Sequence, residues 1–277
     1  MPLHGLSGHR KCRFSRSRQT GRLKDLLKGG SVMTDERLIF EEKAPYLNIT
    51  VNRPDEGNKF LDEMLVDLAD RINEATAQGG LNGIVLRGVG PDFSHGREQK
   101  IGADGPPSNA YDARTRFMDK ILNVYAAFRA FPSPIITVVQ GKALGFACAL
   151  VAGSDIAFAS TNATFALPEM HHGTPPTLAI SAHTKVAAKT VAHLVYSAEE
   201  IDAKHALASG LVSRIVELDQ LDATVERFLE TLAGFDQVDI ATVKKYIATS
   251  PGLPPDIASD LAGYTMATIK SRHNSYK

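Results

Sequence analysis

Polar and acid–base side chains gather in three segments of the sequence: PDFSHGREQ (91–99), QGKALGFACAL (140–150) and FALPEMHHGTPP (165–176). The first places a glycine among polar residues directly after an expected strand, where α/β folds bind ligands. The second is a strand–glycine–helix junction, whose backbone N–H groups and helix dipole could stabilise an oxyanion. The third sets one carboxylate and two histidines among apolar residues. Two N–H groups and one carboxylate would suffice for proton transfer beside a carbonyl group.

Each segment also has a plainer explanation. A glycine-rich strand–helix junction is commonly a packing feature, and a single glutamate after proline, such as Glu169, is commonly a surface residue. His171 and His172 are adjacent, so their side chains point in different directions, and no further ligands follow at metal-binding spacing. We therefore predict no metal site, and the function has to be inferred from the order and spacing of all three segments.

The elements that must position these residues alternate between short strands and longer helices. Strands are expected at 47–54, 83–90, 134–141, 155–160, 163–168 and 210–217. Helices are expected at 64–74, 114–131, 177–195 and 199–209, from Gly145 onward, and from Leu221 to the end with a break at 250–255. A helix between two such strands indicates a βαβ crossover, so the predicted fold class is α/β.

Composition and charge restrict the class of protein. Of the 277 residues, 43% are hydrophobic and 22% charged, which is typical of a folded globular protein. The formal charge is zero, but residues 1–33 hold eight bases and one acid, which leaves 23 bases, 30 acids and a charge of −7 on residues 34–277. An acidic body argues against nucleic-acid binding. The most apolar run is interrupted by polar residues and glycines, so we predict no membrane span.

Residues 1–33 are expected to be a basic extension outside the folded part. It is either a disordered extension, with Met33 opening the protein proper, or a segment that resembles a transit peptide in its Arg and Ser content. The two cysteines do not indicate a disulfide and favour a reducing compartment. We therefore expect a cytoplasmic protein, or a mitochondrial one if the extension is a transit peptide. The rest is divided into a core at 34–220 and a helical region at 221–277.

Four motifs occur in an order that is specific when taken together: VNRPDEGNKFLDEM (51–64), GIVLRGVGPDFSHGRE (83–98), the long stretch from SPIITVVQG to LPEMHHG (133–173), and SAEEIDAKHALASGLVSRIVE (197–217). Over roughly residues 36–250 the chain resembles the crotonase superfamily, the enoyl-CoA hydratase/isomerase fold. The resemblance implies a spiral of ββα units with an acyl-CoA-binding core and a C-terminal helical region used for trimerisation. It also implies a homotrimer or a dimer of trimers, and an acyl-CoA thioester substrate with no separate cofactor.

The resemblance assigns roles to individual positions. The family holds the thioester oxygen between two backbone N–H groups, which here belong to Arg97 and Phe146. Both side chains are larger than is usual at these positions, so the size of the acyl pocket does not follow from the resemblance. Lys59 or Arg97 would pair with the phosphates of coenzyme A. The further positions assigned to substrate and coenzyme A binding are Asp55, Gly57, Lys59, His95, Gly96, Gly145, Pro168 and Gly173.

The informative departure from the family concerns acid–base chemistry. Hydratases of the family use two glutamates to hold one water; here the first position is Ala149, whereas the second is kept as Glu169. A single carboxylate can still move a proton between two carbons, because the base then serves as the acid. Members with one glutamate in this arrangement are Δ3,Δ2-enoyl-CoA isomerases, so we expect isomerisation. Apolar neighbours of Glu169 would raise its pKa.

Three alternatives stay open at this point. Hydration could persist without the first glutamate, and a histidine such as His95, His171 or His172 could support decarboxylation or hydrolysis. The third alternative is a protein that binds CoA esters without converting them, since Ala149, Phe146 and Arg97 all depart from the family pattern.

Overall fold

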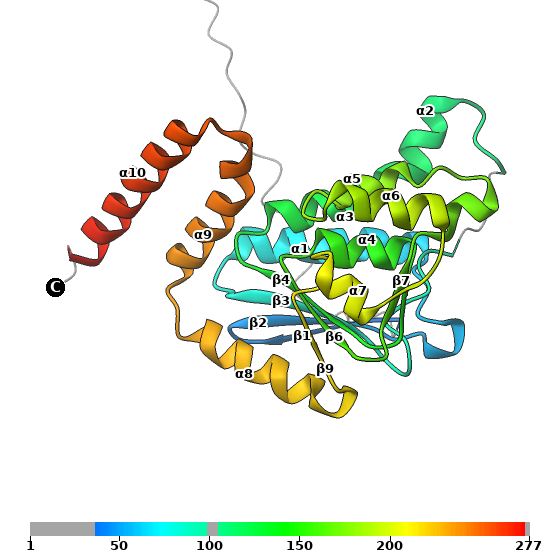
Figure 1. The fold of residues 1–277 in the computed structure, drawn as a ribbon, viewed down its shortest axis with the longest axis horizontal. Coiled ribbons are helices and arrows are strands. Elements are labelled where there is room, and N and C mark those ends of the chain that lie inside the picture. The colour runs from blue at the N-terminus through cyan, green and yellow to red at the C-terminus, as the bar shows by residue number, and fades with distance from the viewer. Residues whose placement is uncertain (1–36, 99–104, 275–277) are drawn as a thin grey trace, which may run out of the picture. The chain divides into compact units, whose positions relative to one another are not determined.

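A six-stranded sheet forms the centre of the computed structural model, which describes residues 37–98 and 105–274 (Figure 1). Its strands are hydrogen-bonded in the order β1 (Leu38–Lys43), β2 (Tyr46–Val51), β3 (Gly83–Gly88), β4 (Ile135–Val139), β6 (Ile156–Ser160) and β9 (Arg214–Val216). Only β1 and β2 pair antiparallel; every other pair in this sheet is parallel. All five residues of β4 are buried, as expected for a parallel strand that is covered on both faces.

A smaller sheet contains β5 (Lys142–Leu144), β7 (Thr164–Ala166) and β8 (Ile201–Asp202), in that order. The chain passes from β4 in the large sheet to β5 in the small one at Gly141. This glycine has φ +55°, and a Cβ atom there would lie 2.2 Å from the Pro91 carbonyl oxygen. Only glycine allows this turn, because a side chain would collide with the backbone.

Helices cover both faces of the large sheet. The helices of the described residues are α1 (Asp62–Gln78), α2 (Ala110–Ala113), α3 (Asp119–Ala130), α4 (Phe146–Gly153), α5 (Thr177–Ala182), α6 (Ala188–Ser197), α7 (Ala203–Ala208), α8 (Leu221–Ala233), α9 (Gln237–Thr249) and α10 (Pro255–Asn274). Helices α1, α3 and α4 pack on one face and α8 on the other. A π-helical turn, Arg114–Met118, precedes α3, and 3-10 turns form at Pro54–Glu56, Pro168–His172, Leu218–Gln220 and Ser250–Gly252. Every helix of the described residues is too short or too polar to cross a membrane.

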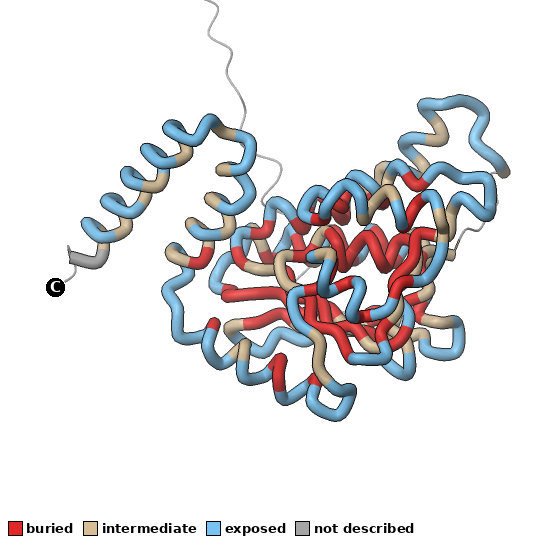
Figure 2. The backbone as a smooth tube through the Cα atoms, in the orientation of Figure 1, coloured by how far each residue is buried: buried red, intermediate tan, exposed pale blue. Residues whose placement is uncertain are grey.

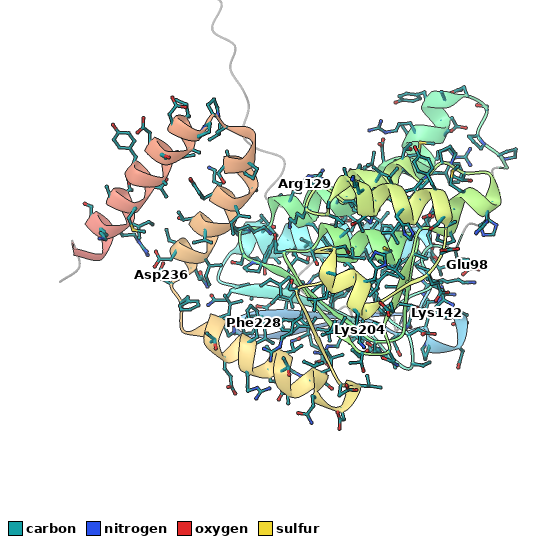
Figure 3. The ribbon with its side chains drawn as sticks, viewed as in Figure 1. Glu98, Arg129, Lys142, Lys204, Phe228 and Asp236 are labelled. Carbon is teal, nitrogen blue, oxygen red and sulfur yellow. The ribbon has the colours of Figure 1, made fainter. Side chains whose placement is uncertain are left out.

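Alternating side chains of the strands divide the core into two parts. Ile84 of β3 packs into a cluster with α1, α3 and α4, whereas the neighbouring Val85 packs with α8 on the other face. On that second face Phe228 of α8 lies against Phe158 of β6, with ring centroids 5.4 Å apart (Figure 3). Helix α4, with the sequence FACALVAG, is buried along almost its whole length and lies in the centre of the first cluster (Figure 2).

The C-terminal helices are attached to the core through Lys244 of α9. Its ammonium group lies 2.8 Å from Asp155 and donates to the carbonyl oxygens of Phe128 and Ser133 at 3.1 and 2.9 Å. Burial would raise the pKa of Asp155, but Lys244 and Lys185 lower it below its ordinary value. Helix α10 contacts α9, where the Tyr246 hydroxyl donates to the Ala258 carbonyl oxygen at 2.8 Å. No residue of α10 whose exposure is described is buried (Figure 2).

The predicted α/β fold class is confirmed, and several predicted elements need correction. The single helix expected at 177–195 is two helices, because the chain turns at His183, whose ring lies 2.7 Å from the Ala179 carbonyl oxygen. Near its start, the helix expected at 199–209 forms the short strand β8 instead. Of the strand expected at 210–217, only residues 214–216 pair with a neighbouring strand, β6. Strand β1 was not predicted. The break at 250–255 is confirmed by the turn before α10, and the chain also turns between α8 and α9. The extension 1–33 lies outside the described residues.

The ion pair of Lys244 gives a stability prediction. Lys244→Met removes the largely buried partner of Asp155 and leaves the carboxylate only the half-exposed Lys185. This substitution should therefore lower the free energy of unfolding by about 3 kcal/mol. Lys185, with a side chain 42% exposed, also contacts Asp155, and Lys185→Met should cost less than about 1 kcal/mol. Urea denaturation of both variants measures the difference. Equal losses would show that burial does not set the strength of this pair.

Candidate active site

A segment around Ser94 pairs with β5 and brings two of the chemical motifs together. The Ser94 N–H donates to the Lys142 carbonyl oxygen at 2.9 Å, and the Leu144 N–H donates to the Ser94 carbonyl oxygen at 3.0 Å. The following Gly96 has φ +94°, and a Cβ atom there would lie 2.7 Å from the Leu144 carbonyl oxygen and 3.5 Å from the Phe146 nitrogen. A glycine at 96 is therefore what allows this segment to approach the start of α4.

Two backbone N–H groups are left without acceptors where these segments meet. Gly96 and Glu98 form the hydrogen bonds to Phe60 in a parallel bridge, so the N–H of the intervening Arg97 points away from that bridge. Phe146 is the first residue of α4, where a helix offers its N–H no internal partner. Within residues 37–98 and 105–274 neither N–H donates to an acceptor. The structure thus places the two predicted donors in adjoining segments at the positive end of a helix.

Glu169 lies beside the same end of α4. It follows Pro168 in the turn after β7, and a Cβ atom on Gly145 would lie 3.0 Å from its Oε1 atom. Its Oε2 atom is buried and forms no hydrogen bond with any described residue. Burial raises the pKa of Glu169, and the opposing effects of its own backbone N–H and of His172 are smaller. A half-buried carboxylate with one unpartnered oxygen is suited to accept a proton from a substrate.

The backbone around Glu169 is held by a glycine cap. Gly173 ends the 3-10 turn in the left-handed conformation, with φ +71°, and the Thr174 N–H donates to the Glu169 carbonyl oxygen at 3.1 Å. His171 and His172 are both exposed. Pro168 and Gly173 therefore position the carboxylate through the backbone.

Ala149 is fully buried one turn into α4, where its N–H donates to the Gly145 carbonyl oxygen at 3.0 Å. The eight residues of α4 include no carboxylate. A methyl group consequently stands at the position where the family resemblance expects the first glutamate of a hydratase, and Glu169 has no carboxylate partner from this helix.

The Phe146 side chain packs into the core. It is 6% exposed, meets the Phe60 ring edge-on with centroids 5.2 Å apart, and stacks on the Tyr125 ring at 5.9 Å. Tyr125 lies within the helix expected at 114–131 and was not singled out from the sequence. Helical periodicity gives no sign that its ring stacks on Phe146.

The Arg97 side chain is engaged by α1. Its Nε and Nη2 atoms donate to Asp62 at 2.9 and 2.6 Å, and Lys120 donates to the other oxygen of Asp62 at 2.9 Å. Burial opposes ionisation of Asp62, but Lys120 and Arg97 lower its pKa below the usual range. Of the two cations expected to meet coenzyme A phosphates, Lys59 is the exposed one.

His95 and Gly57, both assigned to substrate and coenzyme A binding, are in contact. The His95 N–H donates to the Gly57 carbonyl oxygen at 2.8 Å, and a Cβ atom on Gly57 would lie 2.6 Å from the His95 ring. The same ring pairs through Nε2 with Asp92 at 2.8 Å. Asp92 was not singled out from the sequence, although its spacing of three residues from His95 was a usable signal. Asp55 is exposed in the turn that precedes Gly57.

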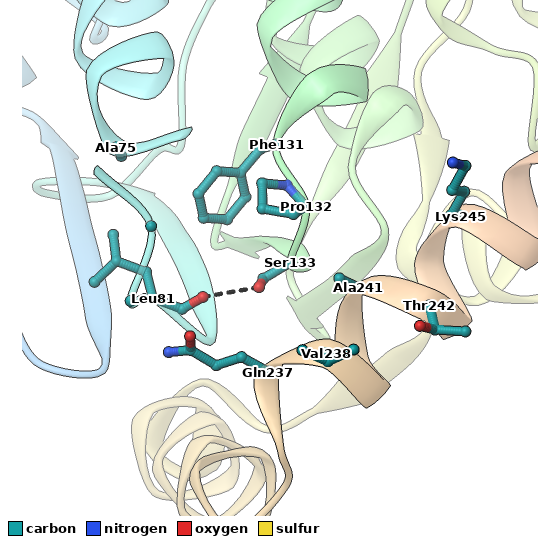
Figure 4. Close-up of a pocket in the computed structure, with 12 residues that line it drawn as sticks. Ala75, Leu81, Phe131, Pro132, Ser133, Gln237, Val238, Ala241, Thr242 and Lys245 are labelled. Atoms are coloured by element: carbon teal, nitrogen blue, oxygen red, sulfur yellow. Dashed lines mark hydrogen bonds between the residues drawn. The ribbon is translucent and has the colours of Figure 1, made fainter. Parts of the chain in front are cut away.

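A cavity of about 320 Å³ lies elsewhere, where the end of α1 and the turn after α3 face α9 (Figure 4). Ser133 donates to the Leu81 carbonyl oxygen across its wall at 2.8 Å. Its lining includes Lys245 but no carboxylate or histidine, so it offers no acid–base pair. The candidate active site is therefore the region around Glu169.

Comparison with known proteins agrees with this geometry. The sequence model of the enoyl-CoA hydratase/isomerase family matches residues 41–257. The chain belongs to this family. The rat protein named enoyl-CoA hydratase domain-containing protein 3, mitochondrial, is 31% identical over 216 residues, which are 76% of this chain and 69% of the rat protein.

Other members of the enoyl-CoA hydratase/isomerase family extend the likeness. A Mycobacterium tuberculosis protein named (7aS)-7a-methyl-1,5-dioxo-2,3,5,6,7,7a-hexahydro-1H-indene-carboxyl-CoA hydrolase is 30% identical over 204 residues, 71% of this chain and 78% of that protein. The crystal structure of human enoyl-CoA hydratase domain-containing protein 3 superposes with a TM-score of 0.76 at 24% identity, over 84% of this chain and 91% of the human one. The crotonase fold predicted from the sequence is thereby confirmed.

The burial of Glu169 gives a prediction for stability against pH. Because its pKa is raised in the folded state, the folded protein loses stability as pH rises from the unfolded value, about 4.3, through the folded one. Glu169→Gln removes this loss, so the variant should be more stable than the original protein at neutral pH, with the advantage shrinking below about pH 4.

Urea denaturation between about pH 4 and pH 8 measures the effect. Glu226→Gln, an exposed site on α8, is the control for the substitution itself. A Glu169→Gln variant that is less stable at neutral pH would contradict the assignment of a desolvated carboxylate.

Proposed function

We propose that this member of the enoyl-CoA hydratase/isomerase family moves a double bond within an enoyl-CoA by proton transfer. The supporting observation is one half-buried carboxylate, Glu169, with an unpartnered oxygen beside the start of α4, while position 149 is alanine. Coenzyme A enters as part of the substrate, and no separate cofactor is proposed.

Each step uses groups already described. The thioester oxygen accepts hydrogen bonds from the N–H groups of Arg97 and Phe146. Glu169 takes a proton from C2 of a 3-enoyl-CoA, and the electron pair spreads into the thioester as a dienolate that the two N–H groups stabilise. The protonated Glu169 then returns the proton to C4, which leaves the double bond between C2 and C3. The same carboxylate is base and acid, so a second glutamate is unnecessary.

The first test follows conjugation of a 3-enoyl-CoA by ultraviolet absorption. Glu169→Gln should lower kcat by roughly 10²–10⁴-fold, because the variant lacks the general base, and Glu226→Gln should leave it unchanged. In the original protein kcat should rise with pH, with a midpoint above that of an ordinary glutamate. Absence of turnover, or turnover unchanged in Glu169→Gln, would refute isomerisation by this carboxylate.

Hydration and hydrolysis are the second candidate reactions. Relatives carry hydratase and hydrolase names, and His95 forms a pair with Asp92 that could act as a base. A panel of 2-enoyl-, malonyl- and β-oxoacyl-CoA esters distinguishes these reactions from isomerisation. Loss of turnover in His95→Ala but not in Glu169→Gln would show that the catalytic base is the histidine and not Glu169.

Phe146 bears on the acyl group that the site accepts. We propose that its ring limits acyl length. Phe146→Ala should admit longer acyl chains, at a cost of about 3 kcal/mol in stability. Phe128→Ala removes another buried ring of the same core and should cost a similar amount without changing acyl preference. Equal preferences in both variants would show that Phe146 only packs. If CoA esters bind but none is converted in any of these assays, the chain is a CoA-ester-binding protein.

Assembly and location are proposed on the same basis. We propose a homotrimer or a dimer of trimers formed through the C-terminal helices, which expose Ile247, Tyr264 and Met266 at 62%, 76% and 57%. The rat relative is named a mitochondrial protein, which supports the mitochondrial alternative over the cytoplasmic one. Both proposals extend the family resemblance.

A further inference from the structure

Two buried side-chain polar atoms have no hydrogen-bond partner among the described residues: the Tyr125 hydroxyl oxygen and Glu169 Oε2. Tyr125 is 2% exposed. Leaving a buried hydroxyl or carboxylate oxygen unpaired costs about 1–3 kcal/mol. Buried polar groups are nearly always paired in folded proteins, so an unpaired one calls for a functional explanation.

The two atoms belong to side chains that contact consecutive residues at the start of α4, Gly145 and Phe146. Tyr125 approaches from α3, with its ring stacked on the ring of Phe146 at an interplanar angle of 27°. Glu169 approaches from the turn after β7 and abuts Gly145, the residue before Phe146. Burial raises the pKa of Tyr125, and the negative charge of Glu169 raises it further. The phenol is thus kept protonated, and it is close enough to Glu169 to feel its charge.

The chemistry of the pair restricts what can bind between them. A protonated phenol has one hydrogen to donate, whereas an ionised carboxylate can only accept. An oxygen that satisfies both must accept from Tyr125 and donate to Glu169, which a hydroxyl group does and a carbonyl oxygen does not. The nearby helix α4 carries no carboxylate that could take the place of Glu169.

We infer that Tyr125 is a substrate-binding residue that, together with Glu169, holds one hydroxyl oxygen in the active site. The hydroxyl belongs either to a hydroxylated acyl chain or to a water. This inference rests on the proposed function, because it takes Glu169 as the group that faces the acyl chain. In this arrangement the bound oxygen donates one hydrogen bond to Glu169 and accepts the other from the Tyr125 phenol of α3.

The test compares two ligands that differ only in that hydroxyl group, 3-hydroxybutanoyl-CoA and butanoyl-CoA. Calorimetry should show the original protein binding the hydroxylated ester at least tenfold more tightly, since one hydrogen bond contributes about tenfold. Tyr125→Phe should lower the preference about tenfold, because only the bond to Glu169 remains, and Tyr196→Phe, at an 82% exposed site, should leave it unchanged. Tyr125→Phe should also be at least as stable as the original protein, because it removes an unpaired buried hydroxyl.

A second experiment tests whether the oxygen held by Tyr125 and Glu169 comes from water. If the oxygen comes from water, the protein hydrates 2-butenoyl-CoA, and Tyr125→Phe lowers that rate at least tenfold while Tyr196→Phe does not. The inference is overturned if Tyr125→Phe changes neither the binding preference nor hydration, or if the original protein shows neither. Binding needs no turnover of 3-enoyl-CoA, so failure of the isomerase proposal would be seen separately.

Discussion

The site depends on the pairing of the segment around Ser94 with β5. These hydrogen bonds join the chain after β3 to the small sheet, and the lack of a side chain at Gly96 lets the backbone approach Phe146. Without that contact the Arg97 N–H would not lie near the start of α4. The ion pair between Arg97 and Asp62 holds the same segment against α1. One close backbone approach thus determines where the N–H groups of Arg97 and Phe146 lie relative to each other.

Burial of Glu169 has opposite consequences for folding and for chemistry. Removing a carboxylate from water destabilises its charged form, which makes it a stronger base and a weaker contributor to stability. Apolar packing in the surrounding structure offsets this loss of stability, since α4 is buried along most of its length. The unpaired Tyr125 hydroxyl is a second unfavourable group in the same region. Such groups concentrate where a protein binds a polar ligand.

The C-terminal helices show how a peripheral region can be fixed without a large apolar interface. Lys244 connects α9 to Asp155 and to two carbonyl oxygens of the core. Helix α10 reaches the rest of the chain through α9 and retains exposed apolar side chains. The proposed assembly of subunits through these helices would cover those side chains.

The sequence by itself determined the fold class and the family, and it singled out Glu169, Gly96 and Gly145 as candidate site residues. It could do so because motif order and glycine placement follow from local backbone requirements. It also located the break before α10 through its prolines and glycine. It did not show that the Arg97 guanidinium binds Asp62, that Phe146 packs between Phe60 and Tyr125, or that β1 adds an antiparallel edge. Only the tertiary structure decided that the Tyr125 hydroxyl and Glu169 Oε2 are buried without partners among the described residues. The periodicity of a helix predicts which residues are buried, but which buried atoms lack partners depends on contacts between segments far apart in the chain.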